Sequence, residues 1–172
     1  PYTKIQTSKT PFGHEIHQYK LQNGHNVIVV PKGGSTIVKT FVDSGSMNET
    51  DNIRGISHFI EHNLFNGSSI IKPGEFFNKV SALGAETNAS TNFAQTDYYI
   101  QSAIMSDSDI KTAIEMQGDM IYRPLFDPKM IEKEKGPVTS EISMTNDNDA
   151  NKLYNSLIKK MFNINSNSDS LI

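Results

Sequence analysis

Three side chains suited to metal-assisted hydrolysis lie within five residues: His58, Glu61 and His62, in "GISHFIEHNLFNGS" (residues 55–68). On a helix, residues four apart lie on one face, so both histidines point the same way. Two imidazoles at this spacing can bind one zinc ion, with Zn–N bonds of about 2.0–2.1 Å. Glu61 lies near that face, where it can contact a metal-bound water without binding the metal. The stretch predicts two metal ligands and a general base.

An ordinary amphipathic helix that happens to contain two histidines is the alternative interpretation. Histidines four residues apart occur on many surface helices, and a neighbouring glutamate is common. The ordered pattern His-x-x-Glu-His favours the metal site, because it is an inverted zincin signature. Three apolar residues, Phe59, Ile60 and Leu64, can bury the remaining face of the helix.

A third protein ligand must come from elsewhere in the chain, because two histidines do not complete a catalytic zinc site. The chain has no cysteine, so this ligand must be His, Asp or Glu. In "EKEKGPVTSEISM", Glu134 and Glu141 are seven residues apart and share a helical face. One could bind zinc while the other supports a ligand from behind. Taken alone, the same stretch also fits a solvated, charged helix face.

The composition is typical of a soluble globular protein, with 36% apolar and 20% charged residues in a chain of 172. A net charge of −3 without a basic stripe argues against nucleic-acid binding. No apolar run reaches the roughly 20 residues that span a bilayer, and "PYTKIQTSKT" contains no signal segment. We therefore expect neither a nucleic-acid nor a membrane partner. A cytoplasmic location is favoured, although the lack of cysteine does not fix the compartment.

The strands are predicted from turn signals and alternation. A β-hairpin is expected over residues 15–32, with Asn23-Gly24 as its turn. A further strand lies within residues 35–46, where apolar residues occupy both faces. Residues 85–104, rich in Thr, Phe and Tyr, predict a strand, a loop and a second strand.

The helices are predicted from apolar periodicity and capping residues. Pro73 suits the first position of one helix, and Ser106 or Asp107 can cap another whose apolar positions include Ile110, Ala113 and Ile114. Interruptions of the last helical region are expected at Gly136-Pro137 and at "NDND", residues 146–149. The four predicted helical stretches are about 54–65, 73–83, 107 onward and 128–162.

These elements predict an α+β fold, with a mixed, mostly antiparallel sheet, helices packed on one face and the metal-site helix at the sheet edge. No internal repeat is present, and we predict one domain over residues 1–172. The polar tail "NINSNSDSLI" ends without a structural signal. We interpret the chain as truncated from a longer, multi-domain protein.

Four blocks of the sequence, in order, resemble the N-terminal domain of the pitrilysin-type (inverzincin) zinc metallopeptidases. This family includes insulin-degrading enzyme, mitochondrial processing peptidase and bacterial zinc proteases. The blocks resemble, in turn, an opening hairpin, the signature block, an Asn-Ala-x-Thr strand and the helix that carries the third ligand. They are "LQNGHNVIVV", "DSGSMNETDNIRGISHFIEHNLFNGS", "GAETNASTNFAQTDYY" and "EKEKGPVTSEI".

The resemblance implies a zinc metalloendopeptidase acting on peptides or unfolded segments. It implies that His58, His62 and Glu141 bind zinc and that Glu134 supports the site. Glu61 would be the general base that takes a proton from the zinc-activated water.

The segment that resembles the Asn-Ala-x-Thr strand, residues 88–91, is expected to meet the substrate. Asn88 and Ala89 would line the cleft, where a peptide could add to the sheet edge as an extra strand. A simple loop or sheet edge without this role is the other interpretation of these small polar residues.

A second, similar domain or subunit that closes the cleft is the partner implied by the resemblance, besides the peptide substrate. Without that half, this fragment is expected to be slow or inactive. The alternative function is a non-catalytic zinc-binding subunit or scaffold module of a peptidase-like assembly. Retention of the whole His-x-x-Glu-His motif favours the enzyme.

Overall fold

Two units make up the described part, residues 1–161, of the computed structural model: residues 1–34 and the chain from Ser35 onward. The first unit is an antiparallel sheet of β1 (Tyr2–Lys9), β2 (Glu15–Leu21) and β3 (Asn26–Val29), in that order. The predicted hairpin is confirmed, and Gly24 has φ +87° in its turn, a conformation that favours glycine. β1 was not predicted because all of its residues are exposed and it has no regular apolar alternation.

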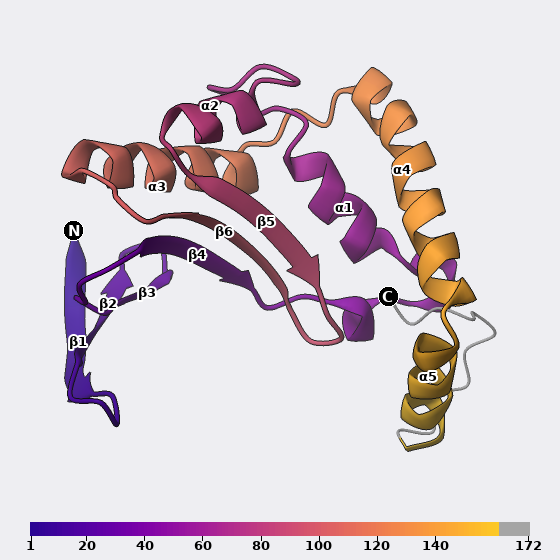
Figure 1. The fold of residues 1–172 in the computed structure, drawn as a ribbon, viewed down its shortest axis with the longest axis horizontal. Helices are drawn as coiled ribbons and strands as arrows, with labels where there is room; N and C mark the ends of the chain where they lie inside the picture. The colour runs from indigo at the N-terminus through magenta and orange to yellow at the C-terminus, as the bar shows by residue number, and fades with distance from the viewer. Residues whose placement is uncertain (162–172) are drawn as a thin grey trace. The chain divides into compact units, whose positions relative to one another are not determined.

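The other unit contains a second antiparallel sheet, with its strands in the order β4-β6-β5 (Figure 1). Its strands are β4 (Thr36–Val42), β5 (Glu86–Thr91) and β6 (Thr96–Ser102). The central strand β6 buries Tyr98 and Ile100, whereas β4 exposes Ile37 and Phe41 on the opposite face. β5 is an edge strand of this sheet, as the sheet order requires.

Helices cover one face of this second sheet (Figure 1). The predicted helix over 73–83 begins later than expected, because Gly74 has φ +82°, outside the helical region, and separates Pro73 from the helix.

Among the described residues, none of the helices is both long enough and apolar enough to cross a membrane. The helices are α1 (Ile56–Leu64), α2 (Phe76–Ala82), α3 (Asp107–Tyr122), α4 (Pro128–Asp147) and α5 (Asp149–Met161).

The hydrophobic core of the second unit lies between the sheet and its helices. α3 contributes Ala113, Met116 and Met120 to this core, but Ile114 is more than half exposed, contrary to its predicted place on the apolar face. Buried Gln117 is accommodated because its amide donates to the carbonyl oxygens of Val38 and Tyr98. The buried core residues are Leu64, Ile71, Phe76, Val80, Tyr98, Ile100, Ala113, Met116 and Met120.

The predicted interruption at Gly136-Pro137 is wrong, because α4 continues through it. A proline inside a helix removes one hydrogen bond and strains the preceding turn, but Val138 is buried next to it. Burial on this side holds the helix together, so Glu134 and Glu141 stay on one continuous helix. The predicted break within "NDND" is confirmed at Asn148, between α4 and α5.

The predicted α+β class is confirmed, with all described strand pairs antiparallel. Two further expectations, a helix reaching residue 162 and the polar tail after it, lie outside the described residues.

Candidate metal centre

The two histidines of α1 share one face, as their spacing predicts. The Nε2 atoms of His58 and His62 are 3.1 Å apart, and the two rings meet edge to face. Both side chains are largely buried. α1 therefore directs two potential ligand nitrogens toward a single point.

Glu141 of α4 completes a group of three possible ligands. Its Oε1 lies 3.7 Å from His58 Nε2, and its Oε2 lies 3.3 Å from His62 Nε2. Ligand atoms of a tetrahedral zinc, at Zn–ligand distances of about 2.0–2.1 Å, lie about 3.3 Å from one another. The three observed separations lie close to this value, so the donor set and its spacing fit zinc.

Glu134 lies on α4 about two helical turns before Glu141, and it fixes the orientation of His62. Its Oε1 lies 3.1 Å from His62 Nδ1, so the Nδ1–H donates to this carboxylate. His62 Nε2 then carries a lone pair that faces His58 Nε2. Two lone pairs at 3.1 Å repel each other unless a proton or a cation lies between them, and the nearby Glu141 carboxylate favours a cation.

Asn66 belongs to the same arrangement but was missed in the sequence. Its Nδ2 donates to Glu134 Oε2 at 3.0 Å, so each oxygen of that carboxylate has a partner. Asn66 follows His62 by four residues, just beyond the end of α1. The only signal for it was this spacing, which places it near the histidine face.

Glu61, the residue before His62, is buried, with 7% of its surface exposed. Its Oε2 accepts a hydrogen bond of 2.6 Å from Thr91 Oγ1 on β5. Burial raises the pKa of Glu61, and the hydrogen bond from Thr91 and the charges of the nearby histidines only partly oppose this rise. A buried carboxylate beside the three candidate ligands is positioned to accept a proton from a group held there.

A cavity of about 260 Å³ opens between α1, β5 and α4. It brings the motif residues Glu61 and His62 together with Asn88 and Ala89 of the edge strand, as the sequence predicts for a substrate cleft. Glu141 lines this cavity and is about half exposed, so the group of three possible ligands borders the cavity. The lining residues are Glu61, His62, Phe65, Asn66, Phe77, Asn88, Ala89, Glu134 and Glu141.

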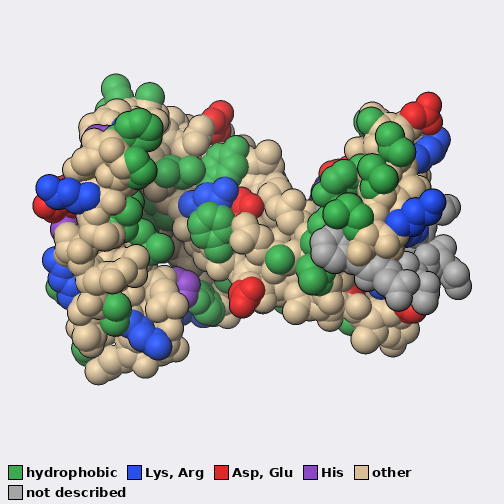
Figure 2. All heavy atoms as spheres, turned by 90° about the horizontal axis from the view of Figure 1, so that it is seen from below, with side chains coloured by type: hydrophobic (Ala, Val, Ile, Leu, Met, Phe, Trp, Pro, Cys, Tyr) green, Lys and Arg blue, Asp and Glu red, His purple; other side chains and the backbone are tan. Residues whose placement is uncertain are grey.

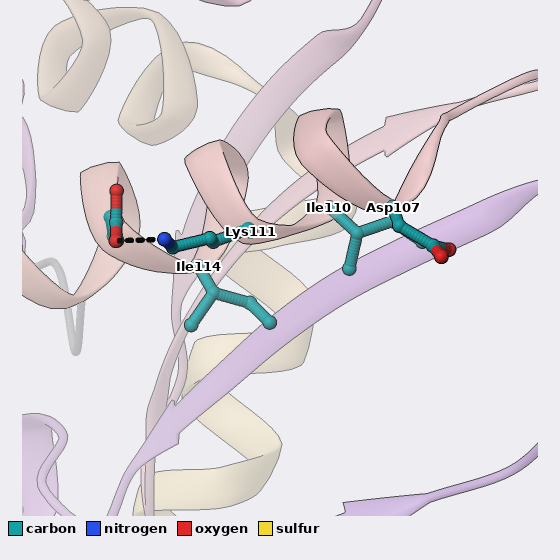
Figure 3. Close-up of a pocket in the computed structure, with 5 residues that line it drawn as sticks. Asp107, Ile110, Lys111 and Ile114 are labelled. Atoms are coloured by element: carbon teal, nitrogen blue, oxygen red, sulfur yellow. Dashed lines mark ion pairs between the residues drawn. The ribbon is translucent and has the colours of Figure 1, made fainter.

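A larger hollow of about 470 Å³ along α3 has a different character (Figure 3). Its lining is mainly Ile110 and Ile114, with Asp107 and a Lys111–Glu115 ion pair of 3.8 Å that is exposed to solvent. It has no histidine and no converging group of metal ligands. Two of the three candidate ligands, His62 and Glu141, instead line the smaller cavity.

Comparison with known proteins identifies the family. The model of the insulinase family (peptidase family M16) matches residues 30–172. The chain belongs to the insulinase family. This confirms the resemblance drawn from the four sequence blocks.

Relatives in the insulinase family are named as proteases. The uncharacterized zinc protease YmfH of Bacillus subtilis is 33% identical in an alignment 159 residues long, which covers 86% of this chain and 35% of YmfH. The chloroplastic stromal processing peptidase of Pisum sativum is 32% identical over 145 residues, 81% of this chain and 11% of that protein. The chain thus spans about a third of the length of YmfH and less of the longer relative.

Solved structures of the same fold support the assignment. The crystal structure of pitrilysin matches with a TM-score of 0.80 at 23% identity, over 92% of this chain and 17% of pitrilysin. A protease from Helicobacter pylori matches with a TM-score of 0.71 at 29% identity, over 77% of this chain and 32% of that protein. The α+β arrangement around the candidate centre is therefore a fold that proteases use.

Proposed function

We propose that this chain is the catalytic domain of a zinc metalloendopeptidase that hydrolyses peptides or unfolded segments. His58, His62 and Glu141 hold the zinc ion. The observation that carries the proposal is the convergence of these three ligands from two helices beside the buried Glu61. Membership of a family whose relatives are named zinc proteases supports it.

Each residue of the centre has a separate task. Zinc, when bound, acidifies a water molecule and polarises the carbonyl of the bond to be cut. Glu61 accepts a proton from the attacking water and passes it to the leaving amine. Thr91 holds the Glu61 carboxylate in place, and Glu134 keeps His62 in the tautomer whose Nε2 can bind the metal.

The edge strand β5 supplies the substrate-binding surface in this proposal. β5 pairs with β6 on one side, and its Ala89 and Asn88 line the cavity. The Ala89 N–H donates to Asn88 Oδ1 at 2.9 Å, a local bond that a substrate carbonyl could replace. An extended peptide would add to this edge through main-chain hydrogen bonds, with little demand on its side chains.

A second homologous domain or subunit completes the active enzyme in this proposal. YmfH and the Helicobacter pylori protease are about three times longer than the matched region. Exposed apolar residues also lie on α5, where Leu153, Leu157 and Met161 are each more than half exposed at helical spacing. Figure 2 shows hydrophobic side chains on its right-hand side, the side on which α4 and α5 lie in Figure 1. Apolar surface of this kind is typical of protein interfaces.

Metal analysis and peptide cleavage test the proposal. The purified chain should contain one zinc ion and should cleave a quenched peptide slowly, and a chelator should abolish this cleavage. Joining the domain to the remainder of its polypeptide should raise the rate. A chain with one zinc ion but no cleavage, even within the complete polypeptide, would instead support a non-catalytic zinc-binding module.

A further inference from the structure

The helix that carries the His-x-x-Glu-His motif has no cap of its own. α1 begins after Gly55, which has φ +87° and no side chain to accept a hydrogen bond. The first N–H groups of a helix need partners from outside the helix. Serine, threonine or aspartate, the usual caps, would be strained at this left-handed backbone position.

Glu49 provides the missing cap from outside the helix. Its Oε2 accepts a hydrogen bond of 2.7 Å from Gly55 N, and its Oε1 accepts one of 2.8 Å from Ser57 N. Both carboxylate oxygens are thus used, and Glu49 is buried, with 9% of its surface exposed. A negative charge at a helix N-terminus is also favoured by the helix dipole. The second contact reaches the residue immediately before His58.

The loop that holds Glu49 is itself fixed to the turn between β5 and β6. Ser46 N donates to Asn92 O at 3.2 Å, and Met47 N donates to Phe93 O at 2.8 Å. Gly45 packs so closely here that a Cβ would lie 2.2 Å from Asn92 O. The same hairpin carries Thr91, the partner of Glu61. α1 is therefore held to one hairpin at its start, through Glu49, and near its middle, through Glu61.

His58 depends on this arrangement more than His62 does. Glu134 orients His62, whereas the buried Nδ1 of His58 has no hydrogen-bond partner within residues 1–161. The direction of His58 Nε2 then follows from the position and rotation of α1 itself. We infer that Glu49 is a positioning residue for the metal centre: by capping α1 from the loop fixed to the β5–β6 turn, it sets how His58 meets Glu141. This inference rests on the proposed zinc site.

Zinc affinity of capping variants tests the inference. Glu49→Ala removes both hydrogen bonds, and Glu49→Gln keeps the side-chain volume but only one acceptor oxygen. Ser106→Ala is the matched control, because Ser106 caps α3 by accepting from Asp109 N, and α3 carries none of the proposed ligands. Zinc affinity is measured by competition with a chelator. The visible absorption of bound Co²⁺ reports the ligand geometry, and circular dichroism confirms that each 172-residue chain is folded.

Glu49→Ala should weaken zinc binding about tenfold and alter the Co²⁺ spectrum, in the range found when groups behind metal ligands are removed. Glu49→Gln should show a smaller change in the same direction and serves alone if Glu49→Ala does not fold. Ser106→Ala should keep the affinity and spectrum of the unsubstituted chain. The inference would be overturned, and the proposed function left standing, if a folded Glu49 variant kept its zinc affinity and its Co²⁺ spectrum. An equal loss of zinc affinity in Ser106→Ala would overturn the inference in the same way. Absence of zinc binding by the unsubstituted chain would overturn the proposed function and the inference with it.

Discussion

Glu134 and Thr91 hold the functional side chains of the centre by single hydrogen bonds from neighbouring elements. Glu134 uses one oxygen for His62 and the other for Asn66. Thr91 holds Glu61 at 2.6 Å, and the Thr91 hydroxyl is itself buried. These bonds decide which atom of each functional side chain faces the centre, so single substitutions can separate metal binding from proton transfer.

Glu61→Gln tests the role of the general base. The amide keeps the size of the side chain and an oxygen that can accept from Thr91, but it cannot take up a proton. We expect zinc content to stay at one ion per chain while the cleavage rate falls by about 10²–10⁴-fold, the usual contribution of a general base. Elemental analysis and a quenched-peptide assay measure the two effects. Normal hydrolysis by the zinc-loaded variant would exclude Glu61 as the base.

Glu134→Ala tests the support behind His62. Loss of this carboxylate frees the Nδ1–H of His62 and the side chain of Asn66, so the ring is no longer held in one orientation. Zinc affinity should fall about 10–100-fold. Titration against a chelating dye measures the change, with Glu132→Ala as the control, because Glu132 lies on the same helix and pairs with exposed Lys135 instead of with the centre. Equal affinity in both variants would contradict the role of Glu134.

The sequence was sufficient to predict the residues of the motif and, through the resemblance, Glu134 and Glu141, but not Thr91 or Asn66. His58 and His62 could be placed on one face because helical spacing alone determines it. Thr91 and Asn66 could not be assigned, because their partners lie 30 and 68 positions away in the chain. Such contacts depend on how β5 and α4 pack against α1, which local patterns do not determine.

At the scale of elements, α1, β5 and α4 must meet for the centre to form. Turn signals and periodicity predicted each of them, but the helix break expected at Pro137 does not occur. A local rule for proline predicts a break, whereas α4 continues past Pro137 with Val138 buried, and Glu141 lies beside His58 and His62. The start of α2 was also misplaced, because the left-handed conformation of Gly74 is not visible in the helical pattern.

Asp119 joins α3 to the segment that follows α1. Its fully buried carboxylate accepts from Ser69 Oγ at 2.6 Å, Ile70 N at 2.9 Å and Arg123 Nε at 2.6 Å. Burial by itself raises the pKa of Asp119, but these hydrogen bonds outweigh it and hold the pKa well below the ordinary 3.8. A carboxylate with a lowered pKa stabilises the fold above its unfolded pKa, and this stabilisation is lost as the pH falls toward the folded value.

Asp119→Asn tests this connection. At neutral pH, the free energy of unfolding of the variant should be about 1–3 kcal/mol lower than that of the unsubstituted chain, because the hydrogen bonds to a buried charge are weakened. The difference should shrink as the pH falls below about 4. Urea unfolding followed by circular dichroism at neutral and acidic pH measures both effects. A difference that stays constant with pH would contradict the lowered pKa of Asp119.

At the scale of the whole molecule, the chain combines a group of three candidate metal ligands with open surfaces. It belongs to the insulinase family and covers about a third of the length of YmfH. The edge strand β5 and the apolar residues of α5 are exposed where a longer polypeptide could pack or a peptide could bind. The sequence predicted the fold class, because its turn signals and its apolar periodicity indicate both strands and helices, but it could not predict which surfaces stay open.

The position of bound zinc tests the central claim most directly. A crystal of the zinc-loaded chain, with anomalous diffraction recorded on both sides of the zinc absorption edge, locates the ion without reference to activity. We predict one anomalous peak within about 2.0–2.2 Å of His58 Nε2, His62 Nε2 and a carboxylate oxygen of Glu141. A zinc peak bound by other residues, or no peak at this group in zinc-saturated crystals, would contradict the account.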